Sequence, residues 1–256
     1  MFALYVSRLT LLFATGVVAG FVDSIAGGGG LITLPVLLSL GLSPQHALGT
    51  NKLQATFGSG SAAWHYSGAK AVDLRDCTRG FFFSVAGAAL GTLAVQHVDP
   101  GFLRRAIPLL LIAIAVYMLV KPQLGAEDIH PRMNRRTFDV LFGLLIGFYD
   151  GFFGPGTGTF WTMAFLLGLG FNLTRATGYT KVMNFASNLS SLAFFLCAHK
   201  VEFSAGFAMG IGQLLGARIG ARMVLVRGTK FIRPVFLAAV LALTLKLLYD
   251  ACRNPN

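Results

Sequence analysis

The sequence predicts an all-α polytopic membrane protein built from two five-segment repeats related by inversion, each with a short broken helix after a glycine-rich turn. Three observations predict this fold class: an apolar composition, a series of apolar runs, and an internal repetition of motifs. Of the 256 residues, 55% are hydrophobic and 12% are charged, and the mean hydropathy is +0.68. A soluble domain of this length could not bury that much apolar surface. The same composition excludes intrinsic disorder, collagen and a disulfide scaffold.

Apolar runs follow one another along the whole chain. Most are long enough to span the ~30 Å of membrane hydrocarbon as helices with a rise of ~1.5 Å per residue. Two runs, Leu31 to Gly41 and Thr159 to Leu169, reach only about half that depth. The runs are continuously apolar rather than alternating, which disfavours a strand-built barrel. They cover about 9–26, 30–42, 53–68, 80–97, 103–120, 137–153, 157–171, 180–198, 204–225 and 231–250.

The second half of the chain repeats motifs of the first half. GFVD at 20–23 matches GFYD at 147–150, and the glycine-rich stretches that follow match at the same offset of 127 (147 − 20). After two extra residues, ALGTNK at 47–52 matches ATGYTK at 176–181, at an offset of 129 (176 − 47). The same five-segment order, long, short, long, long, long, is therefore expected in each half.

The repeats divide the chain into a first transmembrane repeat at 1–120, a polar connecting loop at 121–136 and a second transmembrane repeat at 137–256. If each half crosses the membrane an odd number of times and the N-terminus is outside, most of the 21 Lys and Arg residues fall in inside loops. An even number of crossings removes this bias. The positive-inside rule therefore favours inverted repeats with both termini outside. The same rule accounts for the net charge of +11, so no nucleic-acid partner is expected.

A glycine-rich turn joins the long first segment of each repeat to the short second segment. Each turn leads into a helix N-terminus, which carries about +0.5 charge and attracts anions. Glycine-interrupted short segments at corresponding places in two halves indicate a transporter substrate site. Close helix packing is the alternative, and it explains pairs such as Gly16/Gly20 and Gly87/Gly91. The candidate substrate-binding residues in the turns are Gly27, Gly28, Gly29, Gly30, Gly154, Gly156 and Thr157.

A polar stretch at the start of the third segment of each repeat is the second signal. A lysine within hydrocarbon costs roughly 2.5–3.5 kcal/mol, so it needs a partner or a cavity. Two such lysines beside two helix N-termini would form an anion cage. Alternatively, each lysine extends to the membrane interface, and the sequence leaves both interpretations open. The candidate substrate-binding residues here are Thr50, Asn51, Lys52, Gln54, Thr180, Lys181, Asn184 and Asn188.

Asp23 and Asp150 precede the two glycine turns and lie inside apolar runs. An ionisable residue within a membrane segment is by default a functional candidate. Each carboxylate could carry a coupling proton, neutralise one of the lysines, or cap a broken helix locally. The three cysteines are far apart and lack the spacing of a metal site, so neither a metal, a cofactor nor a disulfide is expected.

The stretches that carry these residues resemble a known family. GFVDSIAGGGGLITLPVLLSLGLSPQHALGTNKLQATFGS and GFYDGFFGPGTGTFWTMAFLLGLGFNLTRATGYTKVMNFASNLSS are similar to the two signature regions of the TauE/SafE sulfite-exporter family. The resemblance covers nearly the whole chain as a tandem duplication. Within this family the sequence is similar to an orphan branch with the GGGG and GTNK motifs, whose substrate is not established. The resemblance implies a multi-pass transporter of the bacterial inner membrane, in a family whose better-known members are linked to sulfite and other small sulfur-containing anions. In the second copy Pro155 and Thr157 replace two of the four glycines.

We therefore expect a secondary transporter that moves a small anion, such as sulfite, a sulfonate or another organic anion, in the direction of export and driven by an ion gradient. Its expected partners are the lipid bilayer and the anion, and a homodimer is left open. An integral-membrane enzyme, an anion channel and an assembly subunit are the alternatives. The enzyme is disfavoured because the stretch FGSG at 57–60 lacks the first glycine of a GxSG motif and no HExxH motif is present.

Overall fold

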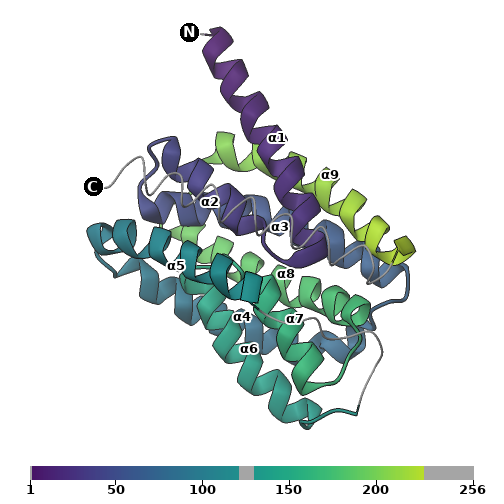
Figure 1. Ribbon diagram of the computed structural model, residues 1–256. Helices are drawn as coiled ribbons and strands as arrows, with labels where there is room; N and C mark the ends of the chain where they lie inside the picture. The colour runs from purple at the N-terminus through teal and green to yellow at the C-terminus, as the bar shows by residue number, and fades with distance from the viewer. Residues whose placement is uncertain (1, 121–129, 228–256) are drawn as a thin grey trace.

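The computed structural model describes residues 2–120 and 130–227 (Figure 1). Within these two ranges the chain forms helices and no strands, which confirms the all-α polytopic fold. The run expected at 231–250 lies outside the described residues. The helices are α1 (Phe2–Ala26), α2 (Gly29–Ser39), α3 (Pro44–Gly68), α4 (Leu74–Gln96), α5 (Pro100–Val120), α6 (Arg135–Phe152), α7 (Thr157–Gly168), α8 (Leu173–Cys197) and α9 (Phe203–Arg227).

The short second segment of each repeat is present as α2 and α7, but the third segments are longer than expected. Hydropathy places their starts near 53 and 180, whereas α3 begins at Pro44 and α8 at Leu173. The side chains of Ser43 and Asn172 cap these helices by accepting backbone N–H bonds. The polar first turns of α3 and α8 can form helix inside the protein because neighbouring helices bury them. The repeated polar motifs therefore lie inside helices rather than at their starts.

Three described helices are long and apolar enough to cross a membrane by length and composition alone. These spans are Val6–Ile25, Leu74–Gln96 and Phe203–Arg227. Helices α3 and α8 are as long as α9, but they carry polar side chains on buried faces. Hydropathy therefore identifies helices exposed to lipid better than it identifies helices at the centre of the bundle.

The helices form two bundles, each of which takes one helix from the opposite half of the sequence. The first bundle contains α1, α2, α3 and α9, and the second contains α4, α6, α7 and α8. In Figure 1 the purple α1 accordingly lies beside the yellow-green α9, although the two helices are at opposite ends of the described chain. The bundles meet mainly along α3 and α8.

Glycines bring the exchanged helices into backbone contact. A Cβ atom at Gly16 would lie 2.1 Å from the carbonyl oxygen of Met209, and one at Gly216 would lie 2.0 Å from that of Val17. In the second bundle a Cβ at Gly91 would lie 2.0 Å from the carbonyl oxygen of an α6 residue. These distances leave no room for a side chain, so the close-packing interpretation holds for these glycines.

The contacts also fix the relative directions of the helices. Along α1 and α9 the contacting residues increase together, from Gly16 against Met209 to Gly20 against Gln213. Along α3 and α8 they run in opposite senses, because Gly49 lies against Phe195 whereas Tyr66 lies against Gly178. The equivalent helices of the two repeats, α3 and α8, therefore cross antiparallel.

The chain passes between the bundles in the loops from α3 to α4 and from α8 to α9. Lys70 has φ 57° in the first loop and His199 has φ 54° in the second, and they are the only non-glycine residues with positive φ among those described. They are 129 residues apart (199 − 70), which is the repeat offset. The internal repetition therefore extends to a backbone conformation that L-residues rarely adopt.

Candidate functional site

The two glycine turns meet between the bundles. Gly27, Gly154 and Gly156 have φ of 78°, 93° and 79°, in the left-handed region that favours glycine. A Cβ atom at Gly158 would lie only 2.5 Å from Cα of Gly27. The backbones of the two turns are thus in direct contact. Gly158 was not among the residues predicted for the site.

The short helices begin at this contact. The first residue of α2 is Gly29 and that of α7 is Thr157, and glycines at 28 and 156 occupy the N-cap positions. The side chain of Thr157 donates a hydrogen bond of 2.6 Å to the carbonyl oxygen of Gly154, which steadies the second turn. Both electropositive helix starts therefore adjoin the centre of the molecule.

Each lysine of the repeated motif forms an ion pair with the aspartate of the other repeat. Lys52 Nζ lies 2.6 Å from Asp150 Oδ1, and Lys181 Nζ lies 3.1 Å from Asp23 Oδ2. The lysine side chains are 1% and 0% exposed. The interpretation in which they extend to the membrane interface is therefore wrong. The lysines do not form an unpaired cationic cage either, because the aspartates neutralise them.

The two ion pairs differ in their surroundings. Asp150 is 4% exposed and also accepts a hydrogen bond from Ser187, while Lys52 donates a second bond of 3.1 Å to Asn188. Asp23 is 18% exposed, and its second oxygen accepts the backbone N–H of Gly29 at 3.2 Å. Asp23 therefore caps α2 locally as well as neutralising a lysine, so two of the proposed roles coexist.

Lys181 makes a further bond to the backbone carbonyl oxygen of Asp23. Among the described residues, Lys52 makes no corresponding bond to the backbone of Asp150 and reaches the Asp150 carboxylate and Asn188 instead. The Lys181–Asp23 pair is therefore anchored partly through the main chain, and the Lys52–Asp150 pair through side chains alone.

Other predicted residues join the short helices to their neighbours. Asn51 Oδ1 accepts bonds from Thr33 at 2.6 Å and from Gln54 at 2.7 Å, which links α2 to α3. Thr180 lies 3.1 Å from Thr162, which links α7 to α8. These side chains hold the short helices in place.

Thr50 lies apart from this centre. Its hydroxyl accepts the backbone N–H of Glu202 at 2.9 Å, in the loop from α8 to α9. The structure therefore brings the glycine turns, both ion pairs and the amides near one another, but it does not bring Thr50 to them.

A small cavity of about 30 Å³ lies between the turns. This volume suffices for about two water molecules. The amide oxygens of Asn184 and Gln213 in its lining have no hydrogen-bond partner among the described residues. The lining comprises Asp23, Gly27, Gly30, Asn51, Ala55, Asp150, Gly154, Gly156, Thr157, Gly158, Asn184, Asn188 and Gln213.

Gln213 belongs to the site and was missed by the sequence analysis. It lies on α9, which the first bundle receives from the second repeat, and it is 2% exposed. A Cβ at Gly29 would be 3.1 Å from its amide nitrogen, and a Cβ at Gly58 would be 2.6 Å from its amide oxygen. The only available signal in the sequence was one amide side chain among small and apolar residues. The first repeat has no equivalent amide, because Ser84 occupies the matching position.

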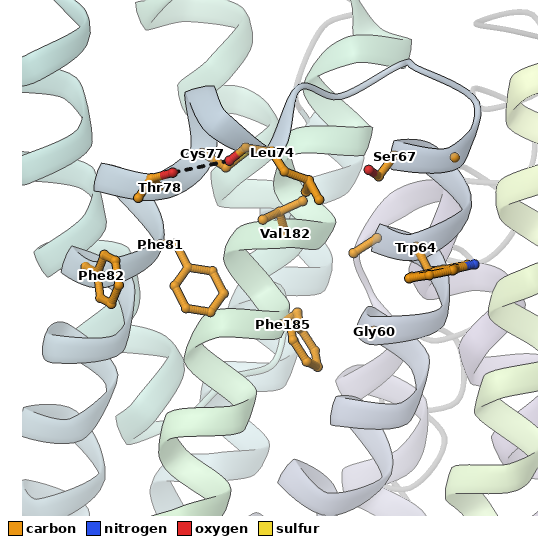
Figure 2. Close-up of a pocket in the computed structure, with 12 residues that line it drawn as sticks. Gly60, Trp64, Ser67, Leu74, Cys77, Thr78, Phe81, Phe82, Val182 and Phe185 are labelled. Carbon is orange, nitrogen blue, oxygen red and sulfur yellow. Dashed lines mark hydrogen bonds between the residues drawn. The ribbon is translucent and has the colours of Figure 1, made fainter.

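A larger cavity of about 590 Å³ lies between α3, α4 and α8 (Figure 2). Figure 2 shows Trp64, Phe81 and Phe185 around it, and none of the described residues that line it is charged. This apolar cavity offers no counter-charge to an anion. The small polar cavity between the glycine turns is therefore the candidate functional site.

The fold and the site define a multi-pass α-helical membrane transporter, in which two broken helices meet at a buried polar cavity. The chain belongs to the sulfite exporter TauE/SafE family, whose profile matches residues 12–247. This result confirms the resemblance found in the sequence. No solved structure matches the chain.

Named relatives are similar over almost their whole length. The chain is 45% identical to a probable membrane transporter protein of Haemophilus influenzae over 245 residues, covering 96% of each protein. It is 45% identical to the probable membrane transporter protein YfcA of Escherichia coli K12 over 243 residues, covering 95% of this chain and 90% of YfcA. The probable membrane transporter protein YunE of Bacillus subtilis is 22% identical over 265 residues, covering 94% and 97%. These relatives are named as transporters rather than enzymes.

Proposed function

We propose that this protein is a secondary transporter that exports a small anion, such as sulfite or an organic sulfonate, across the bacterial inner membrane with the energy of an ion gradient. One observation carries the proposal: the starts of α2 and α7 adjoin a single buried polar cavity. Helix starts supply backbone N–H groups that can donate hydrogen bonds to an anion. The family name, sulfite exporter, supports the choice of anion.

The closed state of the site favours a transporter over a channel. The two glycine turns touch, and the cavity between them holds about two water molecules. A bound anion would need the bundles to separate, and the bundles are joined across this interface by the two lysine–aspartate pairs. Rocking of one bundle against the other around a fixed site is how many secondary transporters alternate access.

The transport proposal is tested by efflux of radiolabelled sulfite from proteoliposomes that contain the purified protein. Asn184→Ala removes a cavity-lining amide whose NH2 group can donate hydrogen bonds to an anion. We expect flux to fall about 10- to 150-fold, because a hydrogen bond to a charged ligand contributes roughly 1.5–3 kcal/mol and each 1.4 kcal/mol is a factor of ten. Folding should be unaffected.

Ser191→Ala is the matched control. Ser191 is buried on the same face of α8 and its oxygen also lacks a hydrogen-bond partner among the described residues, but it does not line the cavity. Its removal should leave flux unchanged. Sulfite and methanesulfonate that both fail to move through the wild-type protein would overturn the assignment of the substrate class. Equal flux in both variants would remove Asn184 from the site.

We further propose that the two repeats are inverted in the membrane. The antiparallel crossing of α3 and α8 supports this, because these helices are equivalent in the repeat. The loops from α3 to α4 and from α8 to α9 should therefore face opposite sides.

Single-cysteine labelling tests the inversion. In a background with Cys77→Ala, Cys197→Ala and Cys252→Ala, we expect an impermeant maleimide added outside intact cells to label Ala198→Cys. Ala69→Cys should react only after the membrane is opened. Labelling of both positions from the same side would show parallel repeats instead.

A further inference from the structure

We propose that Asp23 binds the proton that accompanies each transported anion, whereas Asp150 stays ionised and holds the bundles in register. The inference rests on the proposed function, because it assumes that an anion enters the cavity between the glycine turns. It goes further by assigning different roles to two carboxylates that the repeat makes equivalent.

The starting point is the charge balance of the closed site. Lys52 and Lys181 are each matched by an aspartate, so the four side chains have no net charge. The helix starts add about +0.5 each, but α1 and α6 end just before the two turns and contribute about −0.5 each. An anion in this cavity would therefore add an uncompensated buried charge, which is strongly unfavourable. One proton per monovalent anion restores the balance.

Asp23 is the carboxylate suited to take that proton. Its side chain is 18% exposed whereas that of Asp150 is 4% exposed, and both line the cavity. The cavity has room for about two water molecules, which can deliver a proton to the carboxylate. Asp150 is engaged by Lys52 and by Ser187, so protonating it would disrupt two side-chain contacts.

Lys181 does not itself line the closed cavity, but it is bonded to Asp23, which does, and it can bind the anion once Asp23 is neutral. It donates to the backbone carbonyl oxygen of Asp23 as well as to the carboxylate. Protonation removes the charge of the carboxylate but leaves the carbonyl bond, so the ammonium group stays in position. An ammonium group has three N–H donors, and the donor released by Asp23 can bond to the anion.

The groups that face Asp23 come from every helix packed against α1. Lys181 approaches from α8, and the backbone N–H of Gly29 from α2. Tyr66 of α3 donates to the carbonyl oxygen of Ser24, next to Asp23.

The remaining neighbours are α7 and α9. Helix α7 carries no titratable residue. Helix α9 contributes the neutral Gln213 to the cavity. The side chains of Arg218 and Arg222, also on α9, are exposed. Across the cavity stands the Lys52–Asp150 pair. Apart from Asp150, which is paired with Lys52, no other carboxylate among the described residues lines the cavity and competes for the proton.

The resulting cycle is electroneutral. A proton and a monovalent anion bind from one side, the bundles rearrange, and both leave on the other side, with no bond to carbon or sulfur formed or broken. Net flux follows the combined proton and anion gradients. An inward proton gradient opposes export of the pair, so the ion gradient that drives export is the outward gradient of the anion itself, which must exceed the proton gradient.

Proteoliposomes with a pH-sensitive dye inside test the assignment. Radiolabelled methanesulfonate is the probe, because its sulfonate does not titrate in the range used, and radiolabelled sulfite is measured in parallel. For the wild-type protein we expect one proton to move with each methanesulfonate, and no effect of a clamped membrane potential. Flux should fall up to about tenfold per pH unit where the protonated carboxyl is scarce.

Asp23→Asn should retain anion exchange but lose both proton movement and pH dependence, because the amide resembles the protonated acid and cannot release a proton. Asp23→Asn combined with Lys181→Gln replaces the ion pair with a neutral hydrogen-bonding pair, which tests the same point if the single variant does not fold. This double variant should also show no proton movement.

The outcomes separate the two proposals. Failure of the wild-type protein to move either anion overturns the proposed function. Anion flux without proton movement, stimulation by Na⁺ in place of protons, or unchanged proton coupling in both variants overturns the role of Asp23 and leaves the transport function standing.

Discussion

Gly158→Ala is expected to abolish anion flux and to lower the stability of the folded protein by about 1–3 kcal/mol, the usual cost of forcing a methyl group into a packed interior. The added Cβ would lie 2.5 Å from Cα of Gly27, where only backbone atoms could move. The two turns would have to separate, and the starts of α2 and α7 would separate with them. Flux in proteoliposomes and the thermal midpoint in detergent measure the two effects.

The matched control is Gly68→Ala. Gly68 is also helical, and no heavy atom of the described residues lies within 4 Å of the position that a Cβ atom would take there. Alanine is favoured over glycine in helices by about 1 kcal/mol, so flux and midpoint should equal or exceed those of the wild-type protein. If Gly158→Ala behaved like Gly68→Ala, the two turns would not be in contact in the functional protein.

Lys52→Ala is expected to be the most destabilising single substitution in the site. It leaves Asp150 buried without its counter-charge, and removal of one partner from a buried ion pair costs about 3–5 kcal/mol. Anion flux should be lost as well, because Lys52 joins α3 of the first bundle to α6 of the second. The thermal midpoint in detergent should fall accordingly.

Adding Asp150→Asn to Lys52→Ala distinguishes the effect of an unpaired buried charge from the effect of the lost contact between the bundles. The double variant has no unpaired buried charge, so it should regain most of the lost stability, while flux stays low because the bundles no longer share this ion pair. Arg104→Ala, at an exposed position of α5, should change neither quantity. A stable, active Lys52→Ala protein would show that the pair contributes little to either.

The internal repeat made much of the site predictable. Because the same motif occurs twice, each glycine turn could be found from the other, and the lysines and aspartates appeared as equivalent pairs. The exchange of partners could not be foreseen. Lys52 and Asp150 are 98 residues apart, and Lys181 and Asp23 are 158 apart. Sequence spacing indicates contacts along one helix, not which of two equivalent aspartates a lysine will meet.

Hydropathy did not predict where α3 and α8 begin, because protein rather than lipid surrounds their first turns. The first turns of α3 and α8 are polar, yet they lie deep in the molecule because facing helices supply hydrogen bonds, as Thr33 does for Asn51. Gln213 was overlooked for a related reason. It belongs to a helix that packs with the other repeat, so the position of its amide follows from the exchange of helices rather than from any motif.

The exchange of the fourth helices has a consequence for biosynthesis. The surface of α1 that carries Gly16 and Gly20 packs against α9, which the ribosome produces last among the described helices. Until then the nascent chain must keep that groove lined by lipid or by the insertion machinery. Neither repeat can mature separately and dock afterwards. The first bundle can instead be completed only late in synthesis, after most of both repeats has been made.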